Sequence, residues 1–146
     1  MKVETNSKVL EMTQLSSGAW SMTLETHGMA GQIAMPGQFV HVKCGHSRLL
    51  RRPISICNWT EEGALMLLVK VVGEGTRELV RCVPGTELDV LSGLGNGFDT
   101  AKGGERPVLI AGGVGTPPMV QLCKDLREQG RQVTVCLGFR SAQDVI

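Results

Sequence analysis

The sequence predicts a mainly β protein, in which a six-stranded antiparallel Greek-key barrel is followed by the start, as one β-α-β unit, of an α/β domain. Short segments rich in Val, Ile, Leu, Thr and Met alternate with turn residues through the first hundred positions. Lysine and glycine residues at 100–105 indicate a linker, and an unbroken apolar run then leads into a glycine-rich turn. We therefore expect two domains, at residues 1–102 and 103–146.

The expected barrel strands are separated by Ser-Ser-Gly, Gly-Met-Ala-Gly, Pro-Gly and Glu-Glu-Gly turns. Six strands at this spacing favour a small closed barrel. They lie at residues 9–15, 19–26, 38–43, 53–59, 65–72 and 87–91. One helix, at residues 76–82, interrupts them, with Thr76 able to cap its first turn and Pro84-Gly85 able to end it.

The second region reads as strand, turn, helix, strand. Residues 107–111 form an apolar strand, 118–129 have helical periodicity that ends at Gly130, and 132–139 form a second apolar strand. A sheet of two strands cannot bury both of its faces. We therefore expect this domain to be incomplete, or its open face to be covered by a partner or by a second copy of the chain.

Composition excludes several function classes. The chain has 146 residues, 42% hydrophobic and 20% charged, and a net charge of +1, which argues against an electrostatic nucleic-acid binder. Residues 1–6 lack the apolar core of a signal peptide, and no apolar run approaches the roughly 20 residues that span a bilayer. We expect a cytoplasmic protein that does not contact membranes.

Cysteine and histidine spacing argues against a metal site. No two of the five cysteines form a CxxC pair, so we expect reduced, mostly buried thiols with structural roles. The histidines share no metal-ligand spacing, and we expect them on the surface or hydrogen-bonded in the core. These residues are Cys44, Cys57, Cys82, Cys123, Cys136, His27, His41 and His46.

The segment Arg52-Pro53-Ile54-Ser55 can bind an anionic ligand. Arginine can hold a pyrophosphate through a bidentate fork, and proline fixes the backbone without needing a ladder hydrogen bond. Strand alternation places Arg52 and Ile54 on one face, and the Ser55 hydroxyl could bond a flavin nitrogen. The alternative is an ordinary edge strand with two solvated arginines, Arg51 and Arg52.

Two glycine-rich turns precede helices. Gly73-Glu74-Gly75-Thr76 would point backbone N–H groups at an anion, or would form a plain strand-to-helix turn capped by threonine. Residues 112–118, Gly-Gly-Val-Gly-Thr-Pro-Pro, allow a dinucleotide pyrophosphate to approach a helix, although they lack the third glycine of the GxGxxG fingerprint. Two anionic cofactors, flavin and then nicotinamide, would explain the three motifs in their order.

Together with Pro36-Gly37-Gln38-Phe39 and Leu94-Gly95-Asn96-Gly97-Phe98, these motifs resemble the ferredoxin-reductase superfamily. Within it the resemblance is to the electron-transfer subunits of dihydroorotate dehydrogenase B, and it covers essentially the whole chain. Isoleucine at position 54, where many flavin reductases of the superfamily have tyrosine, fits that branch.

The resemblance implies an FAD-binding barrel and the N-terminal part of an NAD-binding domain. The cofactor-binding residues expected from the motifs and the resemblance are Arg52, Pro53, Ile54, Ser55, Leu68, Val69, Lys70, Gly75, Thr76, Gly112, Gly113, Gly115 and Thr116. No catalytic acid or base and no metal ligand is expected, because the cofactors supply the redox chemistry. The family's 2Fe-2S cluster is held by cysteines in a C-terminal extension, and none of the five cysteines here has that spacing.

The function implied is that of an oxidoreductase component. It would pass electrons from a dihydroorotate-oxidising catalytic subunit through FAD to NAD in pyrimidine biosynthesis, within a heterotetramer. One alternative is a stand-alone NAD(P)H-dependent flavin or ferredoxin reductase of the same fold. Another is a non-catalytic module that binds flavin or serves a protein interface.

Overall fold

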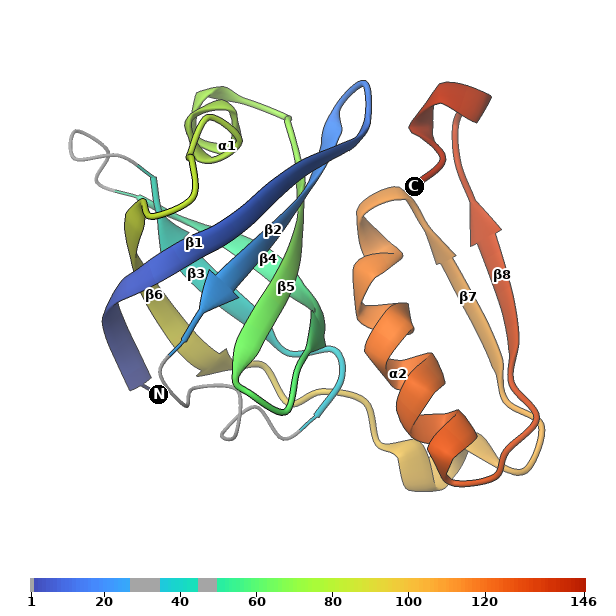
Figure 1. Cartoon of the computed structure of the whole chain (residues 1–146). Coiled ribbons are helices and arrows are strands. Elements are labelled where there is room, and N and C mark those ends of the chain that lie inside the picture. The colour runs from blue at the N-terminus through green and yellow to red at the C-terminus, as the bar shows by residue number, and fades with distance from the viewer. Residues whose placement is uncertain (1, 27–34, 45–49) are drawn as a thin grey trace.

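A computed structural model describes residues 2–26, 35–44 and 50–146, and Figure 1 shows its two parts side by side. The first part is a closed barrel with the strand order β1-β2-β5-β4-β3-β6, in which neighbouring strands are antiparallel. Non-consecutive neighbours such as β2 and β5 give it the Greek-key connection. The predicted barrel is therefore confirmed.

The barrel strands agree with the expected segments except at their ends. They are β1 (Lys2–Ser16), β2 (Ala19–Glu25), β3 (Phe39–Lys43), β4 (Arg51–Trp59), β5 (Ala64–Lys70) and β6 (Glu87–Leu94). The largest difference is in β1, which begins at Lys2 and not at the expected Val9. Its polar start carries no apolar alternation, and its strand conformation comes from pairing with β6, for example Lys2 with Ser92.

The barrel core consists of inward-facing side chains from all six strands, of Cys44 just after β3, and of Leu79 in the helix α1 (Glu74–Leu79). Leu24, Val42, Leu67 and Val90 are among those fully shielded from solvent. Burying apolar surface contributes about 25 cal/mol per Å², so this closed interior is the main source of stability for the barrel. Figure 1 shows α1 lying over one end of the barrel.

The second part begins after the short 3-10 turn η2 (Thr100–Gly103), which lies where the sequence indicated a linker. Its elements are β7 (Val108–Gly112), the turn η3 (Gly113–Gly115), α2 (Pro117–Glu128), β8 (Thr134–Gly138) and the turn η4 (Ala142–Asp144). The strands β7 and β8 are parallel, as expected for a β-α-β unit. Leu109 on β7 packs with Leu122 and Leu126 on α2.

The helix α2 separates the barrel from the two-stranded sheet (Figure 1). It contacts β4 of the barrel as well as β7. The opposite face of the sheet is open, and the side chains of Val108 and Ile110 are 58% and 78% exposed. The two strands thus leave an apolar face uncovered by the described residues, as the sequence predicted.

The cysteines are all free thiols, and their environments differ. Cys44 and Cys57 are buried, and burial raises the pKa of Cys57 although Lys124 opposes the shift. Cys136 departs from the expected burial, because it lies opposite Ile110 on the open sheet and is exposed. His41 is half-buried on β3 beside Phe39, whereas His27 and His46 lie outside the described residues.

Candidate cofactor site at the divergence of two strands

The strands β4 and β5 stop pairing part-way along the barrel wall. Their ladder ends at the pair formed by Ile56 and Leu67. Beyond it, residues 51–55 pair with β3, and residues 68–70 pair with β2. The facing edges of β4 and β5 therefore carry backbone N–H and C=O groups without a ladder partner, which can bond a ligand.

Seven expected site residues lie on these two edges. On β4, Pro53 is exposed, Arg52 and Ser55 are half-buried, and Ile54 is only 7% exposed. The Ile54 side chain belongs to the barrel core. The Ile56 N–H bonds the Gln38 carbonyl on the β3 side, and strand alternation therefore turns the backbone of Ile54 toward β3 and that of Ser55 toward the β5 edge. On β5 the Val69 side chain is likewise in the core, whereas Leu68 and Lys70 are half-buried on either side of it.

The first and second motifs meet at α1. The side chain of Arg52 lies directly against the backbone of Gly75, and a methyl group built at position 75 would be 2.7 Å from Nε of Arg52. Any larger side chain would displace the guanidinium. Because position 75 is glycine, the Arg52 guanidinium can lie against the first turn of α1. A guanidinium beside the backbone N–H groups of a helical first turn is an arrangement that binds phosphate.

The start of α1 differs from the sequence-based expectation. The N-cap is Gly73, three residues before Thr76, because the Thr76 hydroxyl acts within the turn. Its Oγ1 accepts from the Val72 N–H at 3.0 Å and donates to the Gly73 carbonyl at 3.1 Å. The Thr76 hydroxyl is therefore engaged in holding the turn, and the backbone N–H groups of the first turn are the donors open to an anion.

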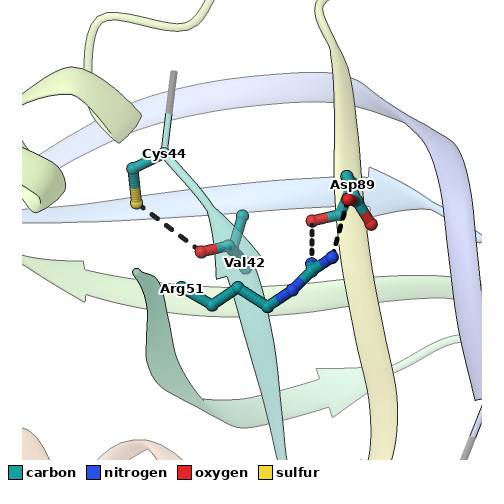
Figure 2. Close-up of polar contacts among 4 residues, drawn as sticks. All are labelled: Val42, Cys44, Arg51 and Asp89. Carbon is teal, nitrogen blue, oxygen red and sulfur yellow. Dashed lines mark hydrogen bonds and ion pairs between the residues drawn. The ribbon is translucent and has the colours of Figure 1, made fainter. Parts of the chain in front are cut away.

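The adjacent arginines have different surroundings, and Figure 2 shows those of Arg51. Arg51 donates from Nη2 to Oδ2 of Asp89 at 2.6 Å and from Nη1 to the Asp89 carbonyl at 3.0 Å. Arg52 makes only long contacts of 3.4 Å, to the carbonyl oxygens of Leu50 and Arg51. Within the described part of the chain, Arg52 has no acidic partner, so its guanidinium can take a ligand phosphate.

The third motif lies close to the β5 edge. Gly113 and Val114 line a small pocket together with Leu68 and Lys70. A neighbouring cleft of about 570 Å³ includes Gly112 and Gly138, at the carboxyl ends of β7 and β8. Ligands of α/β sheets bind outside the carboxyl ends of parallel strands, so this cleft is a suitable place for a second cofactor.

The remaining residues of the third motif surround the start of α2. Gly113 has a φ of +52°, which favours glycine, and Gly115 ends the turn η3. Thr116 is 5% exposed, and its Oγ1 is buried with no hydrogen-bond partner among the described residues. The prolines at the next two positions fit the first turn of a helix, where their missing N–H groups are not needed.

Sequence reasoning missed the acidic side chain in this cleft. Nζ of Lys70 lies 3.4 Å from Oδ1 of Asp144. A hydrogen bond from Ser141 and the nearby Lys70 lower the pKa of Asp144, so its carboxylate is ionised at neutral pH. The available signal was that Asp144 lies in the segment that follows the parallel strand β8, because residues after such strands gather at the binding edge of the sheet.

The architecture has clear counterparts among solved structures. The NADH-dependent reduced ferredoxin-NADP oxidoreductase matches with a TM-score of 0.86 and 27% identity, covering 100% of this chain and 52% of that one. A ferredoxin reductase of carbazole 1,9a-dioxygenase has a TM-score of 0.85 at 21% identity, covering 100% and 46% of the two chains and showing the shared fold. The chain belongs to the ferredoxin-reductase superfamily.

Within that superfamily, the sequence is similar to electron transfer subunits of dihydroorotate dehydrogenase B (NAD(+)). The subunit of Listeria monocytogenes is 41% identical over 146 residues, which cover 97% of this chain and 57% of the relative. That of Shouchella clausii is 39% identical over 142 residues, covering 94% and 54%. This chain therefore spans little more than half the length of these relatives. No family model matches the sequence.

Metal-binding clusters and membrane-spanning helices are both absent from the described residues. No group of three or more His, Cys, Asp or Glu side chains within residues 2–26, 35–44 and 50–146 is arranged to hold a metal ion. In the same ranges, no helix is both long and apolar enough to cross a membrane.

Proposed function

We propose that this chain is the FAD-binding part, with the adjoining start of the NAD-binding part, of a cytoplasmic flavoprotein electron-transfer subunit. The subunit would carry electrons from a dihydroorotate-oxidising catalytic partner through FAD to NAD. The relatives named electron transfer subunits of dihydroorotate dehydrogenase B support this assignment. The domain boundary proposed with it falls between residues 102 and 103.

The observation that carries the proposal is the meeting of Arg52 with Gly75 beside the unpaired edges of β4 and β5. These residues are far apart in the sequence and come from separate motifs. An arginine without an acidic partner among the described residues, a glycine that makes room for it and a helical first turn together fit a pyrophosphate. Open strand edges next to them fit a planar ring that hydrogen-bonds to backbone.

The residues present therefore suit FAD. Arg52 and the N–H groups of Gly75 and Thr76 would hold its phosphates, and residues 53–55 and 68–70 would flank the ring. When bound, FAD supplies the ability to accept and release one or two electrons. The protein contributes position and charge: the closed barrel fixes both strand edges, and the Ser55 hydroxyl offers a hydrogen bond at the surface of β4.

The nicotinamide cofactor is assigned to the cleft at the ends of β7 and β8. Gly112, Gly113, Gly115 and Thr116 would form its wall on the α/β side. Leu68 and Lys70 line a pocket with Gly113, so the two proposed cofactor sites share the end of β5. This proximity would allow the reacting rings to approach each other without a large movement of the chain.

The test of the proposal uses the purified chain and its visible absorption spectrum. The chain is incubated with FAD, passed through a desalting column, and scanned between 300 and 600 nm, the region in which flavins absorb. We expect a retained flavin spectrum with a stoichiometry near one. A chain that is folded by circular dichroism and retains no flavin would overturn the assignment of the barrel site.

A second measurement separates the proposed partner from the alternatives. The chain is coupled to a resin and exposed to a purified catalytic subunit of a type B dihydroorotate dehydrogenase, with a dihydroorotate dehydrogenase that has no electron transfer subunit as the control. Selective retention of the first supports the subunit assignment. Retention of neither, by a chain that does bind FAD, would favour a stand-alone reductase or a flavin-binding module.

A further inference from the structure

The ion pair between Arg51 and Asp89 joins two strands that are not neighbours. In the barrel order, β3 lies between β4, which carries Arg51, and β6, which carries Asp89. Lys43 on β3 is paired with Arg51 on β4. The Arg51 side chain therefore crosses the middle strand to reach the carboxylate, as Figure 2 shows.

The contact has two points of attachment. Nη2 of Arg51 lies 2.6 Å from the Asp89 carboxylate, and Nη1 donates to the Asp89 backbone carbonyl at 3.0 Å. Two hydrogen bonds from one planar guanidinium fix direction as well as distance, which a single ammonium group does not do. Their side chains are 26% and 29% exposed, so solvent screens the pair only in part.

The position of this pair matters because Arg51 is the first residue of β4 and the neighbour of Arg52. This end of β4 has a ladder on the β3 side, while the edge that faces β5 has none. The Arg52 guanidinium bends back toward the carbonyl oxygens of Leu50 and Arg51 at 3.4 Å. Arg51 thus has two roles here. Its side chain bonds Asp89 on β6, and its carbonyl oxygen is one of the two that the Arg52 guanidinium contacts.

We propose that Arg51 and Asp89 are positioning residues, which hold the first residues of β4 so that the Arg52 guanidinium stays against Gly75, ready for a ligand phosphate. This inference rests on the proposed FAD site and adds residues that do not touch the ligand. An arginine that is already in the binding position loses less conformational entropy when the ligand binds, which favours binding. Neither residue was expected to belong to the site from the sequence motifs.

The substitution Asp89→Asn distinguishes a positioning role of the ion pair from a purely electrostatic one, because the two roles predict opposite changes in the Kd for FAD. The substitution removes a negative charge and leaves the charge of Arg51 without a carboxylate, so a purely electrostatic role for the pair predicts tighter binding of the anionic FAD. A positioning role predicts weaker binding, by about three- to tenfold in Kd, because the short charge-assisted bond from Nη2 of Arg51 is weakened and only the bond to the backbone carbonyl of residue 89 is unaffected. Tighter or unchanged binding by Asp89→Asn would overturn the proposal.

The matched control is Lys43→Met, compared with Arg51→Met. Both remove one positive charge from the same cross-strand row, and the Lys43 side chain is exposed and makes no hydrogen bond or ion pair within the described residues. We expect Arg51→Met to raise the Kd for FAD by about tenfold, and Lys43→Met to change it by less than about twofold. Equal effects of the two substitutions would assign the loss to net charge and contradict the positioning role.

A double-mutant cycle then tests whether Arg51 acts through Arg52. Flavin fluorescence titrations give the Kd for FAD of Arg51→Met, Arg52→Met and the double variant, and thermal unfolding without FAD gives their stabilities. We expect Arg51→Met to have little further effect on the Kd once Arg52 is replaced. Additive effects on the Kd would show that Arg51 acts independently of Arg52 and would overturn the proposal.

These measurements also separate this inference from the proposed function. If the unsubstituted chain retains no FAD, the cofactor site itself is refuted, and the positioning role is refuted with it. If the chain binds FAD and Arg52→Met weakens binding, while Arg51→Met behaves like Lys43→Met, then the FAD site stands and the positioning role alone is refuted.

Discussion

The barrel and the α/β unit bury their apolar residues to very different degrees. In the barrel, fourteen buried residues of the described chain form one cluster, and the strands close on themselves. In the α/β unit, Leu109, Leu122 and Leu126 form the buried cluster, while Val108 and Ile110 face solvent. The barrel can be stable by its own packing, whereas the second unit depends on the barrel surface that α2 contacts.

This difference in packing explains why the cofactor motifs of the two regions are anchored differently. The arginine and first glycine motifs sit on strands and a helix anchored in the barrel core, through Ile54, Val69 and Leu79. The second glycine-rich turn lies at the end of a two-stranded sheet, and its position relative to the barrel is fixed by α2 against β4. We therefore expect FAD binding to tolerate damage to the α/β unit better than damage to the barrel.

The largest expected effect comes from truncating a leucine in each core. Leu67→Ala removes a fully buried side chain at the centre of the barrel and should lower the free energy of unfolding by about 3–4 kcal/mol. Leu122→Ala, at 5% exposure in a three-residue cluster, should cost about 2 kcal/mol, because its surroundings can collapse or admit water more easily. Urea denaturation followed by circular dichroism measures both, and an equal loss would contradict the comparison.

The next largest effect is expected on the Kd for FAD, when one arginine in each region is replaced by alanine. Arg52→Ala should weaken FAD binding by about 1.5–3 kcal/mol, as expected for a lost charge-assisted contact. Arg106→Ala removes an exposed arginine at the start of the α/β unit and should leave the Kd for FAD within about twofold. Isothermal titration measures both, and unchanged affinity in Arg52→Ala would remove the residue from the proposed site.

Much of the barrel could be predicted from the sequence because its strands alternate and its turns contain Gly and Pro. The parts that could not be predicted depend on tertiary contacts. The polar start of β1 is a strand because β6 pairs with it, and α1 begins at Glu74 because Thr76 bonds back to Val72 and Gly73. Neither effect leaves a periodic signal in the sequence.

For the site, the motifs identified which residue types can bind phosphate, but they did not show which would be free to do so. Arg52 is expected in the site from the sequence, as the first residue of the Arg-Pro-Ile-Ser motif, and the fold adds the physical difference, because Asp89 pairs with Arg51 and Gly75 lies against Arg52. The break in pairing between β4 and β5 at Ile56 was not visible in the sequence, because both strands continue beyond it. Pairing partners are a property of the closed barrel and not of either segment.

A smaller effect is expected from two glycines, each with a positive φ, in different surroundings. Gly97, with a φ of +70°, has no room for a side chain, since a methyl group there would overlap Cβ of Met35 and lie 3.0 Å from the Pro36 carbonyl oxygen. A methyl group built at Gly104, which has a φ of +62°, would have no atom within 4 Å among the described residues other than its chain neighbours. Gly104→Ala should cost about 1 kcal/mol from backbone strain, and Gly97→Ala about 1–2 kcal/mol more because the Met35 segment must also move.

Thermal unfolding of the two alanine variants checks this difference. Gly97 lies in the segment where Phe98 donates its N–H to the Pro36 carbonyl at 2.7 Å, so its replacement should also disturb the contact between the two loops at the end of the barrel. Similar melting temperatures for both variants would mean that the loop contact accommodates a methyl group, and that backbone strain is the whole cost at either position.

The smallest effect is expected on the open face of the sheet, where Val108→Thr should change the free energy of unfolding by less than about 0.5 kcal/mol. The same substitution at Val42, whose side chain is fully buried in the barrel, should cost about 1–3 kcal/mol, because the hydroxyl would be removed from water. Both positions are strand valines, so the pair isolates burial. A loss at Val108 as large as that at Val42 would mean that this face is covered in solution, and its dependence on protein concentration would then tell whether a second copy covers it.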